Sequence, residues 1–414
     1  MQNANSNDLI RHMSYSNLAA QFSEQMSIAA IPIIAVIVLH VSAEQSATLQ
    51  AINTLPFLLL SIPAGILADR YRRKQLMIKT ELIRAVALLM LFLLIYSENL
   101  RIYELAILSF AIATGTVFYS VATPALVASV VEREHLIAAN RKLEISRSVA
   151  FTAGPSLGGI LAGWASGTFA FIAAFLLSIT SIFYLYNLPN EKPREPSGRN
   201  LIKEMLDGMH FILHNKYLRP VVATAFFFNT SWYLFLSVFA YYAINELNFS
   251  APYVGIALGF FGAGMIVGAL FYPYISDRTV FGRQILLGPA CALFSSLLMA
   301  STLLTHNNVI VFIAFFFFGF GPIIWTISTT TLRQVITPTG LIARVSSFIL
   351  TVTFGARPLG AAIGAGLSAT LGVRGCMIAS AIGFTIQAAI IIFSHPARLT
   401  SISSIHSLEE ESTN

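Results

Sequence analysis

Long apolar runs alternate with short polar segments along the entire chain. The run at 309–331, for example, has no charged residue over the roughly 20 positions that an α-helix needs to cross a bilayer. Backbone amides in lipid must be hydrogen-bonded within a helix or a closed barrel, and unbroken apolar runs lack the alternation of barrel strands. The pattern therefore predicts membrane-spanning helices.

The apolar runs fall into two groups of six, separated by the longest polar connection. We predict helices at 18–39, 46–68, 76–96, 103–129, 148–167, 169–188, 220–243, 252–275, 285–304, 309–331, 345–369 and 374–393. The predicted fold is an all-α membrane protein with twelve transmembrane helices in two pseudo-symmetric halves, 1–189 and 220–414. The linker between them, 190–219, contains an amphipathic stretch at 201–214 that predicts a surface helix.

Charged residues are scarce and unevenly placed. They make up 11% of the 414 residues, against about 25% in an ordinary soluble chain. If the N-terminus is cytoplasmic, all but three of the 25 Lys and Arg residues, Arg84 included, lie in loops or helix ends on that side. The positive-inside rule then places both termini in the cytoplasm. This placement accounts for the net charge of +6 without a nucleic-acid partner.

The sequence offers little for catalysis or metal binding. Both cysteines, Cys291 and Cys376, fall in apolar runs, where a free thiol packs as a small hydrophobe. No span gathers His, Cys and carboxylate side chains or pairs a nucleophile with a base, and the sequence has no GxxxxGK loop. We therefore expect neither an enzyme nor an ATP-driven pump, and no cofactor or metal.

The two halves share short sequence signatures. The Asp-Arg pair that follows the second predicted helix, at 69–70, is echoed after the eighth, at 277–278. The segments TPAL and GPSLGG of the first half likewise correspond to TTTL and ARPLGA of the second. Two homologous six-helix halves are the architecture expected of a secondary transporter with a site between them at the membrane midplane.

Two motifs carry a family resemblance. The segment GILADRYRRK, residues 65–74, resembles the loop between the second and third helices of the major facilitator superfamily, with Arg72 where that family usually has Gly. The segment AFTAGPSLGG, residues 150–159, resembles the antiporter motif of the same superfamily, which favours export. The matching positions are Gly65, Leu67, Ala68, Asp69, Arg70, Arg73 and Lys74 in the loop and Gly154, Pro155, Gly158 and Gly159 in the helix.

Longer segments are similar to a narrower group, the drug:proton antiporters that include bacterial macrolide and enterobactin exporters. These segments are SEQMSIAAIP, LPFLLLSIPAGILADR, EHLIAANRKLEISRSVA and GARPLGA, and the resemblance covers nearly the whole chain. It implies the major facilitator fold in a bacterial inner (cytoplasmic) membrane. We expect a monomer whose partners are a small-molecule substrate, protons and the lipid bilayer.

The resemblance also implies a cytoplasmic gate centred on Asp69. This carboxylate would contact the N-terminus of the eleventh helix, where exposed amides and the helix dipole favour a negative charge. The other members of the gate would be Gly65, Arg70, Arg73, Lys74, Asp277 and Arg278. The alternative is that the basic residues of this loop only set the topology.

Small residues in the fifth helix would permit a bend and close helix approach, either for a conformational role or as ordinary packing. By resemblance, the central cavity is lined by the first, fourth, seventh and tenth helices. The candidates there are Tyr119, Thr123, Asn229, Trp232, Tyr233, Trp325 and Thr329. This aromatic and mildly polar set suits a bulky amphipathic or aromatic solute, although core packing would explain each residue equally well.

Two charged residues inside predicted spans are candidates for energy coupling. Glu24, about two turns into the first helix, is costly when ionised at membrane depth, which makes protonation an accessible switch. The alternative is a structural carboxyl that is hydrogen-bonded to neighbouring helices. Arg357, interpreted as the one basic residue at mid-span, needs a partner, which is either Glu24 or backbone carbonyls freed by Pro358 and water in a cavity.

The function expected from these features is export by alternating access, with protons moving in the opposite direction. A dedicated siderophore exporter is the alternative within transport. A membrane sensor with the same fold, which would show no flux at all, is the alternative outside it.

Overall fold

The computed structural model describes residues 6–131, 135–164, 167–189, 201–305, 307–338 and 340–401, and all regular structure in these ranges is helical. The chain divides into two compact units. The first contains Met1–Gly198 and Ser237–Gly259, and the second contains Arg199–Leu236 and Phe260–Asn414. Most of the predicted linker, 190–200, lies outside the described residues.

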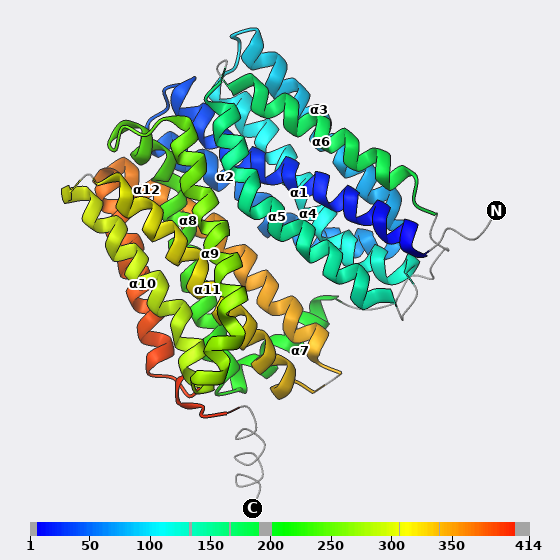
Figure 1. The fold of residues 1–414 in the computed structure, drawn as a ribbon, viewed down its shortest axis with the longest axis vertical. Helices are drawn as coiled ribbons and strands as arrows, with labels where there is room; N and C mark the ends of the chain where they lie inside the picture. The colour runs from blue at the N-terminus through cyan, green and yellow to red at the C-terminus, as the bar shows by residue number, and fades with distance from the viewer. Residues whose placement is uncertain are drawn as a thin grey trace, which may run out of the picture. The chain divides into compact units, whose positions relative to one another are not determined.

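Six helices make up most of the first unit (Figure 1). They are α1 (Ser6–Ile37), α2 (Ala43–Arg70), α3 (Arg73–Tyr96), α4 (Ile102–Val130), α5 (Leu136–Ala162) and α6 (Thr168–Tyr186). Helix α1 packs against α5 and α6, and α3 packs against α4 and α6. The start of α2 is fixed by a capping box, in which the Ser42 hydroxyl accepts from the Gln45 backbone and the Gln45 side chain accepts from the Ser42 backbone.

The second unit contains the later helices and a short surface helix. They are α7 (Leu201–His214), α8 (Leu218–Asn245), α9 (Ala251–Arg278), α10 (Phe281–Thr305), α11 (Asn308–Ile336), α12 (Ile342–Ile392) and the 3₁₀ turn η3 (Pro396–Arg398); the connected ends of α8 and α9 belong to the first unit. Helix α7 packs against α12, where Arg344 and Asp207 form an ion pair at 2.8 Å. The predicted surface helix at 201–214 is therefore confirmed.

Helix α12 comprises two of the predicted spans. Gly372 interrupts it with φ 65° and ψ −169°, a conformation that costs glycine little because glycine has no Cβ. Among the described residues, nine helices are long and apolar enough to cross a membrane, with α12 counted once and the more charged α3 and α5 left out. Counting α12 as two and adding α3 and α5 gives the twelve predicted spans.

Two helix starts differ from the prediction by more than four residues. The first and fifth helices were expected from 18 and 148, but α1 begins at Ser6 and α5 at Leu136. The length of an apolar run shows only the part of a helix that lies in lipid. The first turns of α1 and α5 are polar, so they fall outside the apolar runs and were not predicted. Glu24 consequently lies five turns into α1 rather than two, at 3.6 residues per turn.

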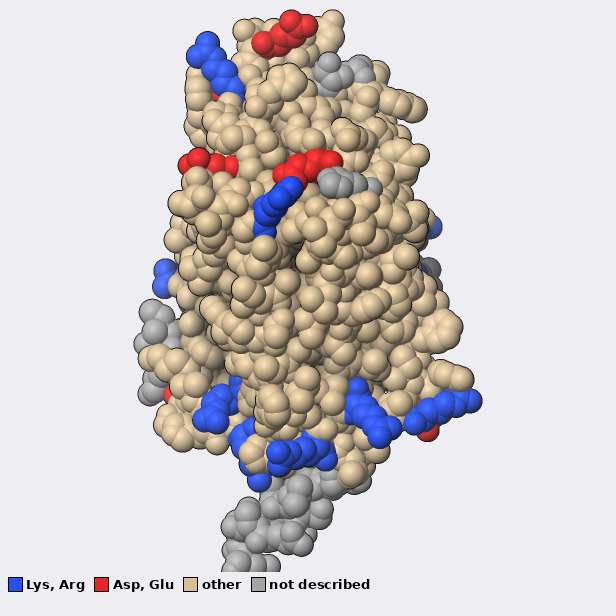
Figure 2. Space-filling view, turned by 90° about the vertical axis from the view of Figure 1, so that its left-hand side faces the viewer, with Lys and Arg blue, Asp and Glu red and all other residues tan. Residues whose placement is uncertain are grey.

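Basic side chains gather at one end of the molecular face shown in Figure 2, and most of the surface above them is uncharged. In the second unit, four arginines lie where α9 and α11 end and where α10 and α12 begin: Arg278, Arg283, Arg333 and Arg344. The start of α10, the end of α11 and the start of α12 meet on one side, because Phe281, Ile336 and Val345 belong to one buried apolar cluster. The arrangement suits a positively charged membrane face, and its cytoplasmic orientation stays a prediction.

Candidate functional site

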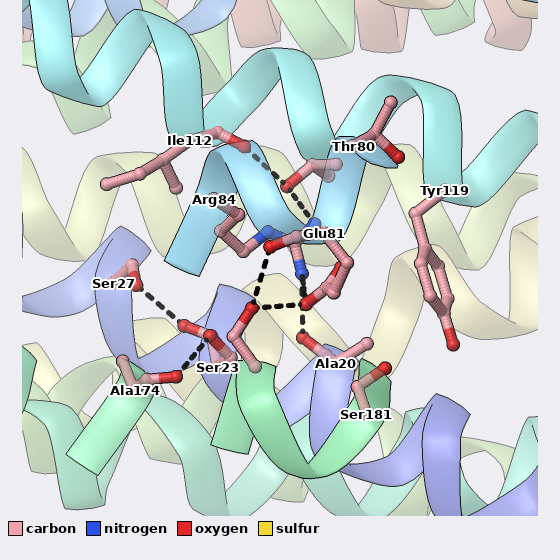
Figure 3. Close-up of polar contacts among 12 residues, drawn as sticks. Ala20, Ser23, Ser27, Thr80, Glu81, Arg84, Ile112, Tyr119, Ala174 and Ser181 are labelled. Atoms are coloured by element: carbon pink, nitrogen blue, oxygen red, sulfur yellow. Dashed lines mark hydrogen bonds and ion pairs between the residues drawn. The ribbon is translucent and has the colours of Figure 1, made fainter. Parts of the chain in front are cut away.

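A buried ion pair lies at the middle of α3 in the first unit (Figure 3). Arg84 is about 16 Å from the start of this helix, which is about 36 Å long at 1.5 Å per residue. The Arg84 Nη1 atom donates to Glu81 Oε1 at 3.0 Å, and the two side chains are 1% and 0% exposed. The interpretation of Arg84 as a helix-end residue and of Arg357 as the one basic residue at mid-span is therefore wrong.

Three other helices supply further hydrogen bonds to this pair, although Glu81 Oε2 and Arg84 Nε have no hydrogen-bond partner among the described residues. Arg84 Nη1 also donates to the carbonyl of Ala20 in α1 at 3.3 Å, and Nη2 donates to Thr116 Oγ1 in α4 at 2.9 Å. The Ser178 hydroxyl of α6 donates to Glu81 Oε1 at 2.7 Å. The pair thus joins α1, α3, α4 and α6 at one level, and removing either partner would leave a buried charge uncompensated.

A chain of hydroxyl groups lies one helical turn away from the ion pair. Ser16 Oγ is 3.1 Å from the Tyr119 hydroxyl and 3.0 Å from Ser181 Oγ. These residues are about one turn from Ala20, Thr116 and Ser178, which contact the pair on the same three helices. The structure places Tyr119 in this interior network, 3% exposed, while the Thr123 hydroxyl donates back to the Tyr119 carbonyl at 2.7 Å.

The glycines of the antiporter-like motif lie at close helix contacts. A Cβ built on Gly154 would be 2.6 Å from the Gln25 Cβ, and one on Gly158 would be 2.6 Å from the Met26 carbonyl oxygen, both in α1. Gly159 meets Gly255 of α9 within the first unit, where a Cβ would be 2.4 Å from the Gly255 Cα. The close approach expected of these glycines is present, and Pro155 is buried beside them.

We predict that Gly158→Ala lowers the free energy of unfolding by about 1–3 kcal/mol, because the added methyl group would press on the backbone of Met26. Thermal unfolding of the detergent-solubilised protein measures this effect. The matched control is Gly366→Ala in α12, where a Cβ meets nothing within 4 Å and little change is expected. Equal stability of the two variants would contradict the prediction.

Two residues of the predicted gate hold helix ends inside the first unit. Arg73 Nη1 donates to the Ala125 carbonyl in the last turns of α4 at 3.2 Å. Lys74 Nζ donates to the carbonyls of Tyr186, at 2.8 Å, and Leu188 at the end of α6. Cations favour the C-terminal ends of helices, so both contacts strengthen this end of the bundle.

The other gate residues lie at helix termini. Arg70 is exposed in the last turn of α2, and a Cβ on Gly65 would meet nothing within 4 Å. Asp277 and Arg278 are exposed at the end of α9, with the Arg278 guanidinium 3.5 Å from the centre of the Tyr274 ring. The side chain of Asp69 lies outside the described residues, so its contact with the eleventh helix stays a prediction.

The two proposed coupling residues are both half-buried. Arg357 in α12 lies over two aromatic rings, with its guanidinium carbon 4.6 Å from the centre of Phe354 and 5.4 Å from that of Tyr233 in α8. Such cation–π contacts partly compensate a charge that is removed from water. The structure thus brings together two of the predicted residues, Arg357 and Tyr233. Glu24 also interacts with another residue, so it is not without a partner. Its pairing with Arg357 remains a prediction.

A cavity of about 330 Å³ lies within the second unit, between α8, α10, α11 and α12. It is lined by three of the predicted cavity residues, Asn229, Trp325 and Thr329. Its walls are mostly apolar and include Phe228. Gly288 of α10 makes room for the Trp325 side chain, since a Cβ there would be 2.4 Å from the Trp325 Cβ. The volume is at the lower end of the range for small-molecule sites, about 300–1,000 Å³.

Trp232, another predicted cavity residue, belongs to an aromatic core. Its ring centre is 4.9 Å from that of Phe318 and 5.1 Å from that of Phe261, and the residue is 8% exposed. Phe235 and Phe315 pack against the same ring at 5.7 and 5.9 Å. Packing of this kind stabilises the second unit and leaves Trp232 little surface for a ligand.

The helices of the described residues account for the twelve predicted spans, so the chain is a polytopic membrane protein. The family model described as transmembrane secretion effector matches residues 6–412, and the chain belongs to this family of the major facilitator superfamily. It is 24% identical to macrolide efflux protein A of Enterococcus faecalis over 274 residues, 66% of this chain and 82% of that protein. It is also 24% identical to macrolide efflux protein A of Streptococcus pyogenes over 331 residues, 77% of this chain and 80% of that protein.

Solved transporters share the fold at low sequence identity. A POT family transporter in complex with 5-aminolevulinic acid has a TM-score of 0.74 and 12% identity, over 94% of this chain and 96% of that one. An inward-facing bacterial homolog of the human lysosomal transporter Spinster has a TM-score of 0.72 and 12% identity, over 97% and 98%. These matches confirm the predicted major facilitator fold.

Sequence reasoning missed the Glu81–Arg84 pair, although a signal was present. Two basic residues flank Glu81 in the sequence, Lys79 and Arg84, and together they suggest a position near the cytoplasmic interface. In the structure, Lys79 is exposed while Arg84 is buried. Residues three apart share a helix face, and residues two apart do not. The spacing of Glu81 and Arg84 therefore indicated a pair that neutralises its own charge.

Proposed function

We propose that the protein exports a bulky amphipathic or aromatic solute by alternating access in exchange for protons. The observation that carries the proposal is the apolar cavity lined by Phe228, Trp325 and Asn229, in a chain whose relatives are named macrolide efflux proteins. An apolar site with a few polar groups suits a solute that has both kinds of surface.

In this proposal, halves 1–189 and 220–414 move about a central site, joined by the linker at 190–219. Both termini are cytoplasmic in a bacterial inner membrane, and the chain acts as a monomer. Glu24 takes up and releases the proton, and Arg357 is its proposed basic partner. The loop at 65–74 acts as the cytoplasmic gate, and its residues Arg73 and Lys74 also brace α3 against α4 and α6.

Everted membrane vesicles test the proposed function. Vesicles energised to acidify their interior are challenged with a panel of dyes, macrolides and iron chelators. We expect protein-dependent accumulation of aromatic or amphipathic members of the panel. Accumulation of catecholate chelators alone would favour the alternative, a dedicated siderophore exporter, and flux of none of them would favour a sensor.

A further inference from the structure

The cavity in the second unit holds an unusual set of polar side chains. Four of its lining residues each carry a buried polar atom without a hydrogen-bond partner among the described residues. The atoms are Thr224 Oγ1, Trp325 Nε1, Arg333 Nε and Gln387 Oε1. Buried polar atoms are normally paired, so their concentration around one cavity indicates a place where a ligand supplies the missing partners.

Arg333 gives this cavity its charge. No Asp or Glu occurs among the described residues that line the cavity, and Arg333 is the lining residue with a formal charge. It lies in the last turn of α11, and its buried Nε atom has no hydrogen-bond partner among the described residues. The nearby Arg344, in contrast, is neutralised by Asp207 at 2.8 Å.

Three of the four unpaired atoms belong to donor groups: the Thr224 hydroxyl, the Trp325 indole and the Arg333 guanidinium. The Gln387 amide supplies either a donor or an acceptor, because its nitrogen and oxygen exchange on rotation. A cavity with surplus donors and one uncompensated cation favours a ligand that is rich in acceptors and negatively charged. The Phe228 and Trp325 rings offer the same ligand an aromatic surface.

We propose that this cavity binds amphipathic organic anions, with a one- or two-ring aromatic body against Trp325 and a carboxylate, phenolate or sulfonate head on Arg333. This inference rests on the proposed export function and narrows its substrates to anions. A guanidinium presents paired N–H donors that match a carboxylate, which gives Arg333 a recognition role beyond its positive charge.

Isothermal titration calorimetry of the purified full-length protein tests this inference with two probes of the same ring system. The anion 2-naphthoate is expected to bind more tightly than the uncharged 2-naphthylmethanol. Arg333→Met should weaken 2-naphthoate binding about tenfold or more, since a charge-assisted hydrogen bond is lost, and should change 2-naphthylmethanol binding little. Arg333→Lys should fall between, because it keeps the charge and loses the forked donors.

The matched control is Arg283→Met, which removes an exposed arginine from the first turn of α10 and should leave both affinities unchanged. Equal weakening of both probes in Arg333→Met, or no preference for 2-naphthoate in the unaltered protein, would overturn the inference. If Arg333→Met does not fold, two results still test the anion site: the affinity of Arg333→Lys for 2-naphthoate, and the preference of the unaltered protein for 2-naphthoate over 2-naphthylmethanol.

The vesicle assay separates the two proposals. Export of neutral or cationic solutes without any Arg333-dependent binding of 2-naphthoate would overturn the anion site and leave the export function standing. Arg333-dependent binding without flux of any solute would overturn export and leave the anion site standing.

Discussion

Glu81→Met is expected to lower the free energy of unfolding by about 3–5 kcal/mol. The substitution keeps the bulk of the side chain and leaves the Arg84 guanidinium buried without its counter-ion. Arginine cannot lose its proton in a protein interior, so the buried positive charge cannot be neutralised by deprotonation. Chemical or thermal unfolding of the detergent-solubilised protein, followed by circular dichroism, measures the loss.

The double variant Glu81→Met/Arg84→Met is the informative comparison. Replacing both partners of a buried ion pair with apolar side chains of similar size is often neutral or stabilising, so most of the lost stability should return. A double variant as unstable as Glu81→Met would show that the hydrogen bonds to Ala20, Thr116 and Ser178 matter more than charge compensation. A stable single variant would contradict the burial of the pair.

Glu24→Gln is expected to abolish transport driven by a pH gradient while leaving substrate binding intact. The amide keeps the size and most of the hydrogen bonding of the carboxyl group but cannot take up and release a proton. Glu24 is half-buried on α1, one turn after Ala20, whose carbonyl accepts from Arg84. A change of charge there would act on the helix that also crosses α5 at Gly154 and Gly158.

Transport into proteoliposomes with an imposed pH gradient measures this effect. Exchange of labelled for unlabelled solute at equal pH on both sides tests substrate binding and the conformational change without proton coupling. Glu44→Gln, an exposed carboxylate in the first turn of α2, is the matched control and should transport normally. Gradient-driven transport by Glu24→Gln at the unaltered rate would remove Glu24 from the coupling mechanism.

The membrane spans could be predicted because lipid imposes a simple rule on run length, and the surface helix α7 could be predicted because its apolar residues recur on one face. The starts of α1 and α5 could not, since their polar first turns extend beyond any apolar run. The gap between the last two predicted spans, 345–369 and 374–393, contains Gly372, where the structure interrupts α12.

The candidate site residues also divide into those that the sequence predicted and those that it did not. Asn229, Trp325 and Thr329 were expected to line a cavity, and they do so within the second unit. Trp232 was expected beside them, but neighbouring phenylalanines enclose it, which depends on helix rotation that sequence does not reveal. Arg333 was assigned only a topological role, because a basic residue at a helix end satisfies the positive-inside rule whether it faces solvent or a cavity.

Purified protein in proteoliposomes tests proton-coupled export most directly. With the lumen acidified to represent the periplasmic side, we predict that protein molecules inserted inside out accumulate an aromatic solute from the vesicle panel in the lumen. A protonophore should abolish this accumulation. Accumulation no greater than in protein-free liposomes, or accumulation that a protonophore leaves unchanged, would contradict it.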